Sequence, residues 1–246
     1  MLQKINKFIL DALFPIACFF CGKRDTWLCD ECLRKLPLLA FQLCPYCEKE
    51  IVSNGHFCEK CKKTALEKNI PPPLDALICA IKYSGISKFV HLFKYNFVSD
   101  LGAPLGKIIV KNFLKSNLPL PDFIIPVPIH KRKLKWRGFN QAEILAQTVS
   151  QNLTPGILLP VHSDILVRRS NTRAQMKIKN YQKRLANIRG AFAVSPEKED
   201  LIRDKKILLI DDIATTGATL FECAKILKSA GAKKVCGAVI ARQEFK

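Results

Sequence analysis

The stretch that most limits how this chain can fold runs from Lys206 to Leu220, with the sequence KILLIDDIATTGATL. Its first part, Ile207–Ile210, is a short run of isoleucine and leucine, which is typical of a buried parallel strand. Asp211 and Asp212 follow at the expected carboxyl end of that strand, where open α/β sheets bind their ligands. The small and hydroxyl-bearing residues after them lead into an apolar segment with helical periodicity. The pattern therefore predicts a strand, a polar turn and a helix of an α/β domain.

The turn has the chemistry that a phosphate group requires. A helix N-terminus offers backbone N–H groups and the positive end of the helix dipole, and threonine adds hydroxyl donors. The two carboxylates before it suit vicinal hydroxyls or a bound Mg²⁺ next to that phosphate. We therefore expect a sugar-phosphate site; the alternative is an ordinary strand–turn–helix with two solvated aspartates. The expected site residues are Asp211, Asp212, Ala214, Thr215, Thr216, Gly217, Ala218 and Thr219.

The segment Asp211–Thr219 resembles, without a gap, the D-D-x-x-T-T-G-x-T loop that binds phosphoribosyl pyrophosphate (PRPP) in type I phosphoribosyltransferases. The resemblance implies that the acidic pair holds the ribose hydroxyls and the turn holds the 5′-phosphate of PRPP, with Mg²⁺ bound alongside. A P-loop ATPase shares the apolar run and the acidic pair, but it also requires G-x-x-x-x-G-K-[ST]. The nearest stretch, Gly102–Ile108, is one residue short and lacks the Ser or Thr.

The chain is strongly basic, with 40 Lys and Arg against 21 Asp and Glu and a formal net charge of +19. Such an excess favours anionic substrates or polyanionic partners. Much of it lies between His130 and Gly190, where thirteen basic and two acidic side chains give a net charge of +11. Five cations within Lys131–Arg137 follow a predicted buried strand at Asp122–Val127. We expect this run to contact the pyrophosphate of PRPP, with a solvated basic loop as the alternative. The expected contacts are Lys131, Arg132 and Arg137.

Eight of the eleven cysteines form four C-x-x-C pairs between residues 18 and 61. Each pair directs two thiolates at one ion, and two pairs complete the tetrahedral shell of a structural Zn²⁺. Disulfides are disfavoured, because nothing in the sequence marks the chain as secreted. The sequence therefore predicts two structural zinc ions, with the ligands Cys18, Cys21, Cys29, Cys32, Cys44, Cys47, Cys58 and Cys61.

The four pairs can share two ions sequentially or in an interleaved order. We favour sequential sharing, with the first two pairs on one ion, because its shorter loops close at a lower entropy cost. His56 lies close to the last pair, but all pairs are complete without it, and we interpret it as a solvated loop histidine. The remaining Cys79, Cys223 and Cys236 lie in apolar runs, and we interpret them as small buried side chains.

The rest of the sequence predicts how these parts are ordered. Residues 1–15 have helical apolar spacing and no cleavage site, which predicts an amphipathic docking helix and not a signal peptide. We expect the double zinc ribbon at 16–63, a stiff proline-containing linker at 64–75 and the α/β domain at 76–246. No apolar run is long enough to span a membrane, so we expect a cytoplasmic protein.

Within the α/β domain, apolar runs predict strands and helical spacing predicts helices. The expected strands, besides Ile207–Ile210, are Ala76–Tyr83, Asp122–Val127, Asp164–Arg168, Phe192–Val194 and Lys234–Ala241. The expected helices include Ile86–Phe97, Ala103–Leu114 and a basic helix at Asn180–Arg189. The alternation indicates four or five nearly parallel strands with flanking helices.

Two further runs narrow the resemblance. HKRKLKWRGFNQAE begins at His130 and VRRSNTRAQM begins at Val167. Both are similar to segments of the ComF/GntX family, competence-associated proteins with a double zinc ribbon before a type I phosphoribosyltransferase domain. The resemblance implies a role in natural transformation, with single-stranded DNA and other competence proteins as partners. It also implies a flexible loop that closes over the reaction centre, with the matching positions Arg169, Thr172, Gln175, Arg184, Asn187 and Phe192.

Two functions fit these features. One is Mg²⁺-dependent transfer of phosphoribosyl from PRPP to an unknown nitrogen acceptor. The other is a non-catalytic module that binds single-stranded DNA and keeps the PRPP site for binding or sensing alone. A zinc-ribbon adaptor with an inactive α/β domain is disfavoured, because the loop motif is intact. No residue stands out as the general base.

Overall fold

The computed structural model describes residues 16–49, 51–69, 72–95, 99–170 and 186–243. By its internal contacts, the chain divides into two compact units, residues 1–36 and 37–246. The docking helix predicted at residues 1–15 lies outside the described residues. Among the residues that are described, no helix has the length and apolar character needed to cross a membrane.

The first unit consists of a tight loop followed by a short helix. Backbone hydrogen bonds close the loop, from the Gly22 N–H to the Cys18 carbonyl at 2.8 Å and from the Cys18 N–H to the Lys23 carbonyl at 2.7 Å. Helix α2 (Asp30–Lys35) has acidic residues in its first turn and basic residues in its last turn. The helix dipole favours that distribution of charge.

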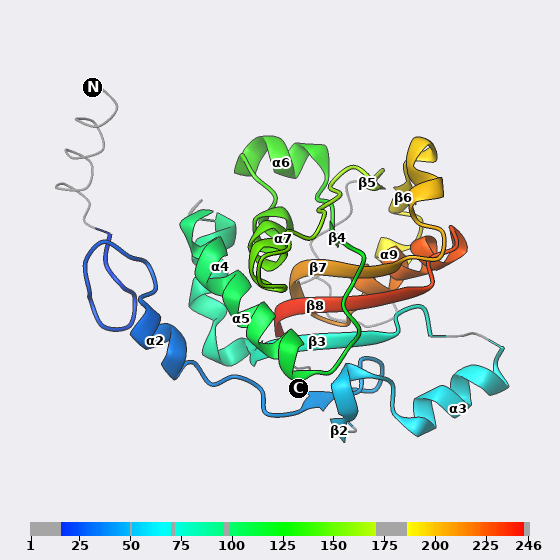
Figure 1. Ribbon diagram of the computed structural model, residues 1–246, viewed down its shortest axis with the longest axis horizontal. Coiled ribbons are helices and arrows are strands. Elements are labelled where there is room, and N and C mark those ends of the chain that lie inside the picture. The colour runs from blue at the N-terminus through cyan, green and yellow to red at the C-terminus, as the bar shows by residue number, and fades with distance from the viewer. Residues whose placement is uncertain (1–15, 50, 70–71, 96–98, 171–185, 244–246) are drawn as a thin grey trace. The chain divides into compact units, whose positions relative to one another are not determined.

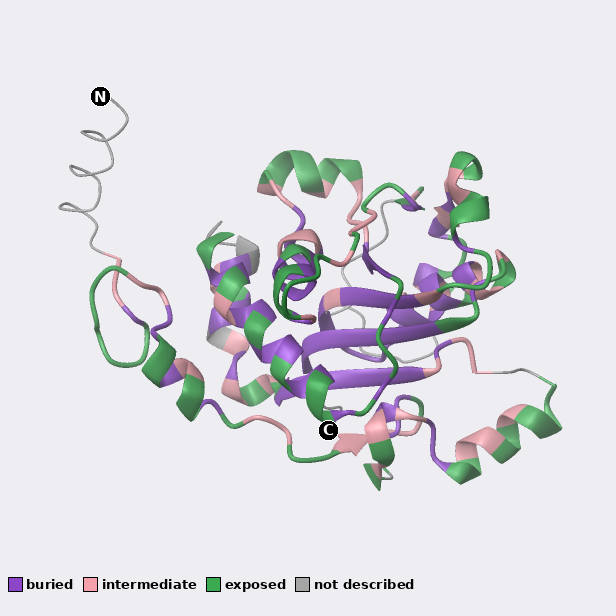
Figure 2. Ribbon diagram, in the orientation of Figure 1, coloured by how far each residue is buried: buried purple, intermediate pink, exposed green. Residues whose placement is uncertain are grey.

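The second unit is organised around a four-stranded parallel sheet (Figure 1). The strands lie in the order β3-β8-β7-β4. Their bounds are Ala76–Lys82 (β3), Phe123–Pro126 (β4), Lys206–Ala214 (β7) and Lys234–Arg242 (β8). Most of their residues are buried (Figure 2), as expected of a parallel sheet covered on both faces. An isolated parallel bridge between Ile124 and Val161 adds a short fifth segment beside β4. The predicted α/β fold is confirmed.

Helices cover both faces of the sheet. On one face lie α5 (Gly102–Lys115) and α7 (Gln141–Asn152), with α4 (Ser87–Tyr95) preceding α5 in the chain. On the other face lies α9 (Ala218–Ser229), whose apolar side chains share a buried cluster with alternate residues of the strands. Helices α5 and α7 approach closely at Gly106, where a Cβ would lie 2.5 Å from the Cβ of Thr148.

An antiparallel pair lies outside the main sheet. It consists of β5 (Leu166–Arg168) and β6 (Phe192–Val194), which are followed by the 3₁₀ helix η5 (Pro196–Leu201). The basic helix predicted at Asn180–Arg189 lies mostly outside the described residues, although residues 186–188 are helical.

The second cysteine group belongs to the same unit as the sheet. Cys44 and Cys47 follow β1 (Gln42–Leu43), which pairs with β2 (Ile51–Val52). After the 3₁₀ turn η1 (Ser53–Gly55), Cys58 and Cys61 lie at the start of α3 (Glu59–Glu67). Its buried residues Cys44, Phe57 and Cys58 share one core cluster with Leu77 of β3 and Phe221 of α9.

The boundary between the two compact units falls at Leu36, between the two cysteine groups, and α3 ends at Glu67. The modules expected at 16–63, 64–75 and 76–246 stay a prediction. Cysteine spacing describes only the metal ligands. The second group is joined to the sheet by contacts between apolar side chains that lie far apart in the sequence. A local sequence pattern does not predict such contacts.

Candidate functional site

Strand β7 carries the two predicted carboxylates past the end of its neighbour. Its pairing with β4 ends at Ile210, whereas its pairing with β8 continues to Ala214. Asp211 and Asp212 therefore lie where β7 projects beyond β4, at the carboxyl edge of the sheet. The strand is longer than the predicted Ile207–Ile210, because the register with β8 extends it through the acidic pair.

The two carboxylates have different surroundings. Each accepts a hydrogen bond from the next backbone N–H, Asp211 from Asp212 at 2.8 Å and Asp212 from Ile213 at 2.7 Å. Asp212 is only 7% exposed, whereas Asp211 is half-buried. Burial lowers the pKa of the Arg168 guanidinium, and the nearby Asp211 carboxylate opposes that shift. Asp211 is thus the more accessible carboxylate and has a cation close to it.

The turn after β7 is buried and depends on a glycine. Thr215 and Thr216 are 8% and 1% exposed. Gly217 precedes α9 with a φ of 75°, a left-handed conformation that glycine adopts without strain. The Thr216 hydroxyl oxygen accepts a hydrogen bond from the Ala218 N–H at 3.3 Å, which ties the turn to the first residue of α9. The positive end of the helix dipole therefore lies at this turn.

The basic run after β4 forms a helix, α6 (Lys131–Arg137), which the charge pattern did not indicate. His130 caps its start, because the imidazole Nδ1 accepts the Arg132 N–H at 3.2 Å, and Gly138 ends it with a φ of 78°. Lys131 and Arg132 are exposed. Because β4 and β7 are parallel neighbours, α6 follows the strand end next to Asp211.

The R-G-F-N-Q sequence holds the end of α6 in place. Arg137 donates from Nη1 to the Gln141 side-chain oxygen at 3.0 Å, and Gln141 donates to the Phe93 carbonyl at 3.3 Å. Asn140 caps α7 by accepting the Ala142 N–H at 3.2 Å, and it donates to the Val127 carbonyl at 3.1 Å. The chain after α6 is thereby fixed to the residue that follows β4.

Two arginines near the predicted site were missed by sequence reasoning. Arg168 ends β5, with its guanidinium 5.1 Å from the Phe192 ring centroid, and its charge acts on both His130 and Asp211. Desolvation lowers the pKa of His130, and the surrounding cations, Arg168 among them, lower it further. Arg242 ends β8 in register with Ala214 and is 9% exposed. A single cation at a strand end has no periodicity, so the sequence pattern does not indicate either of these arginines.

The positions that match the expected closing loop are only partly described. Arg169 follows β5, Phe192 begins β6, and Asn187 lies in the short helical stretch before it. The others, Thr172, Gln175 and Arg184, lie outside the described residues.

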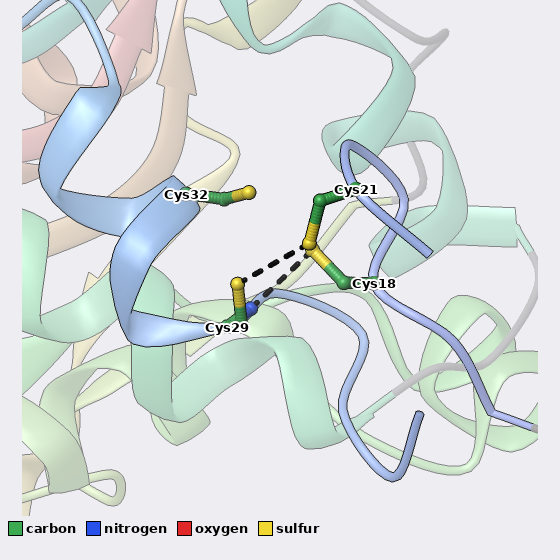
Figure 3. A group of neighbouring side chains, drawn as sticks. All are labelled: Cys18, Cys21, Cys29 and Cys32. Carbon is green, nitrogen blue, oxygen red and sulfur yellow. Dashed lines mark hydrogen bonds between the residues drawn. The ribbon is translucent and has the colours of Figure 1, made fainter. Parts of the chain in front are cut away.

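The first cysteine group brings Cys18, Cys21, Cys29 and Cys32 together, with all four sulfur atoms within 4.8 Å of one another. Figure 3 shows the four side chains converging from the loop and from the start of α2. The Cys29 N–H donates to the Cys18 sulfur at 3.5 Å. Burial acts to raise the pKa of Cys18, but backbone N–H donors outweigh it and lower that pKa to about 6. Burial and the neighbouring cysteines raise the pKa of Cys32 to about 12.

The second group has the same arrangement, with the sulfur atoms of Cys44, Cys47, Cys58 and Cys61 within 4.8 Å of one another. The Cys58 N–H donates to the Cys44 sulfur at 3.4 Å, and burial raises the pKa of Cys61. Four thiols this close cannot all ionise without a cation between them, which fits a tetrahedral zinc site. The sequential sharing favoured from the sequence is confirmed.

The three isolated cysteines are buried, as predicted. Cys79, Cys223 and Cys236 are 7%, 0% and 7% exposed. Burial raises the pKa of Cys79 and of Cys236 to about 11, so their thiols stay protonated near neutral pH.

Comparison with known proteins agrees with this architecture. Residues 9–62 match the double zinc ribbon domain family, and residues 137–244 match the phosphoribosyl transferase domain family. The chain is 28% identical to the DNA utilization protein YhgH of Salmonella typhi, over 85% of this chain and 93% of the relative. The chain is similar to the ComF competence proteins in both of its domains. It is also 27% identical to Competence protein F of Haemophilus influenzae, over 85% of this chain and 87% of the relative. It is 25% identical to Competence protein ComFC of Bacillus subtilis, over 86% of this chain and 82% of the relative.

Proposed function

We propose that this protein binds PRPP together with Mg²⁺ at the carboxyl edge of its sheet. The observation that carries the proposal is the projection of β7 beyond β4, which exposes one end of the acidic pair beside the start of α6. In the proposed complex, Asp211 and Asp212 bind the ribose hydroxyls, and the turn from Ala214 to Thr219 binds the 5′-phosphate. The side chains that bind the pyrophosphate are Lys131, Arg132 and Arg137.

The expected chemistry is phosphoribosyl transfer. A nitrogen nucleophile forms a bond to C1 of the ribose while the bond from C1 to the pyrophosphate oxygen breaks, and the electron pair leaves with pyrophosphate. Positive charge builds on the sugar and negative charge on the leaving group. The carboxylates of the acidic pair suit the positive charge on the sugar, and the cations of α6 suit the negative charge on the pyrophosphate. Mg²⁺, when bound, neutralises part of the pyrophosphate charge.

The biological setting that we propose is DNA uptake. The relatives are named as competence proteins and as a DNA utilization protein, and they align over most of their length. The strong positive charge of this chain suits a polyanionic partner.

Calorimetric titration of PRPP in the presence of Mg²⁺ tests the site. Asp211→Asn and Asp212→Asn each remove one charge but keep the side-chain oxygen that accepts the next backbone N–H. We expect each variant to lose detectable PRPP binding. Asp164→Asn is the matched control, because Asp164 forms an exposed ion pair with Lys198 away from the turn. Unchanged affinity in both site variants would reject the assignment.

A second candidate function is contact with single-stranded DNA, which the surface of α6 favours. Trp136 is 59% exposed on that helix, between exposed Lys135 and half-buried Arg137. An aromatic ring among cations is the combination that single-strand binding proteins use to stack a base and neutralise its phosphates.

Binding of a fluorescent oligonucleotide across a salt series tests this second function. We expect the logarithm of the affinity to fall with the logarithm of salt by about 0.7 for each phosphate contacted. Trp136→Ala should weaken binding, whereas Leu158→Ala, which removes another exposed apolar side chain, should not. Absence of binding at low salt would exclude the DNA role.

A further inference from the structure

A buried arginine connects the second cysteine group to the turn that we propose for phosphate. Arg242 donates from Nη2 to the Pro45 carbonyl at 2.7 Å and to the Glu48 carboxylate at 2.8 Å. It also donates from Nε to the Thr215 carbonyl at 3.4 Å. Pro45 lies between the ligands Cys44 and Cys47, and Glu48 follows them directly. One guanidinium therefore contacts the metal-binding turn on one side and the phosphate turn on the other.

A packing contact joins the same two turns by a separate route. Phe57 directly precedes the ligand Cys58, and its ring centroid lies 6.4 Å from that of Phe221 in α9. The Phe221 ring in turn lies against Gly217, where a Cβ would be only 3.2 Å from it. The cysteine group thus reaches the phosphate turn at Thr215 through hydrogen bonds and at Gly217 through aromatic packing.

We propose that Arg242 is a positioning residue through which the zinc-loaded second cysteine group sets the conformation of the phosphate turn. Metal occupancy of this group and PRPP affinity are then coupled. The PRPP part of this inference rests on the proposed function, whereas the effect of the cysteine group on the turn does not.

The geometry gives the physical reason for the coupling. A guanidinium is planar and rigid, so its donors hold the Pro45 and Thr215 carbonyls at a fixed separation. The Pro45 carbonyl stays in place only while the four sulfur atoms are held together. When they separate, Arg242 loses that acceptor, and the Thr215 carbonyl is released from its fixed donor. Buried charge-assisted hydrogen bonds are strong enough to transmit such a change.

Hydrogen–deuterium exchange of the full-length, zinc-loaded chain tests the effect on the turn without any ligand. We expect faster exchange in a peptide that covers residues 214–219 for Arg242→Met and for Glu48→Ala. Glu48→Ala changes neither Arg242 nor any residue of the turn. It removes only the carboxylate that accepts from Arg242 next to the ligand Cys47. Lys198→Met, which removes one exposed ion pair, is the matched control and should leave the turn unchanged. Unchanged exchange at the turn in Glu48→Ala and Arg242→Met would overturn the proposal.

The coupling must also be reciprocal, which a purely structural role of Arg242 does not require. In wild-type protein, PRPP with Mg²⁺ should slow the removal of zinc from the second cysteine group by a chelator, by about tenfold. Removal from the first group should not change. Cys21→Ser, which disables the first group alone, identifies which kinetic phase belongs to which site. In Arg242→Met the protection by PRPP should be lost.

These measurements separate the possible failures. If wild-type protein does not bind PRPP, the proposed function fails, but the exchange measurement still decides whether the second cysteine group controls the turn. If PRPP binds and protects neither zinc site, or protects both equally, the coupling through Arg242 is wrong. If Arg242→Met loosens the whole domain, exchange in Glu48→Ala decides between coupling and its absence, because that variant removes only one of the acceptors of the arginine.

Discussion

The two cysteine groups share their chemistry and differ in their attachment to the rest of the molecule. In both, two C-x-x-C pairs gather four sulfur atoms, and the third cysteine donates its N–H to the sulfur of the first. In both, the residue before the third cysteine is buried, Leu28 in one and Phe57 in the other. The first group lies in the unit of residues 1–36, whereas the second shares its buried cluster with the sheet.

The difference teaches that ligand spacing determines the metal site but not its place in the fold. That place depends on the side chains between the ligands. Phe57 reaches Phe221, and Gly55, with a φ of 69°, lies so close to the Leu77 carbonyl that no Cβ would fit. Zinc in the second group therefore supports part of the core of the α/β domain, while zinc in the first group supports its own unit.

The largest expected effect comes from removing equivalent ligands. Cys58→Ser should lower the melting temperature of the α/β unit by about 10 °C or more, because zinc binding is part of the folding free energy of the core that it supports. Cys29→Ser removes the equivalent cysteine of the first group. It should leave the melting of the α/β unit unchanged to within about 1 °C. Calorimetry, with the zinc content of each variant measured, compares the two.

Equal effects of the two ligand variants would show that the groups are attached alike. In that case the division of the chain at Leu36 would not describe how the protein unfolds.

A smaller effect is expected from the residues before the third cysteines. Phe57 is 6% exposed and packs on Phe221, so Phe57→Ala should cost the α/β unit about 3–5 kcal/mol in its free energy of unfolding. Leu28→Ala, at a position 4% exposed, should leave the stability of that unit unchanged. Denaturant unfolding followed by far-ultraviolet circular dichroism measures both. Retention of zinc by Phe57→Ala would show that packing, and not metal loss, causes the change.

The sequence was sufficient for features that depend on local patterns. The buried strands, the turn after the acidic pair and the grouping of the cysteines all follow from residue type and spacing within about twenty positions. Contacts between distant residues were not predictable in this way. Arg242 binds Glu48 across 194 positions, and the Arg168 guanidinium lies over the Phe192 ring of a strand 24 positions later in the sequence. Helix α6 was missed because its seven residues, although rich in good helix formers, have no apolar periodicity, and the two residues that stabilise its ends, His130 and Gly138, lie outside the run.

The smallest expected effect concerns His56, which stays outside the second cysteine group, as expected, and is a partly exposed loop residue with one hydrogen bond to the chain. Its Nδ1 lies 2.9 Å from the Asp75 carbonyl, and because a carbonyl only accepts, Nδ1 carries the proton. The Asp75 carboxylate accepts the Val235 N–H at 2.6 Å and pairs with Lys228 at 2.8 Å, so His56 is tied to a residue that anchors the start of β8.

His56→Ala should therefore destabilise the α/β unit by about 1 kcal/mol, the typical net contribution of one hydrogen bond. His56→Asn can place an amide N–H near the position of Nδ1 and should recover much of that loss, as measured by denaturant unfolding. If neither variant changes stability, the attachment of the second group depends on Phe57 and Arg242 without this hydrogen bond. Of these contacts, only Arg242 forms a hydrogen bond to the phosphate turn. That result would therefore assign the coupling between the second cysteine group and the phosphate turn to Arg242.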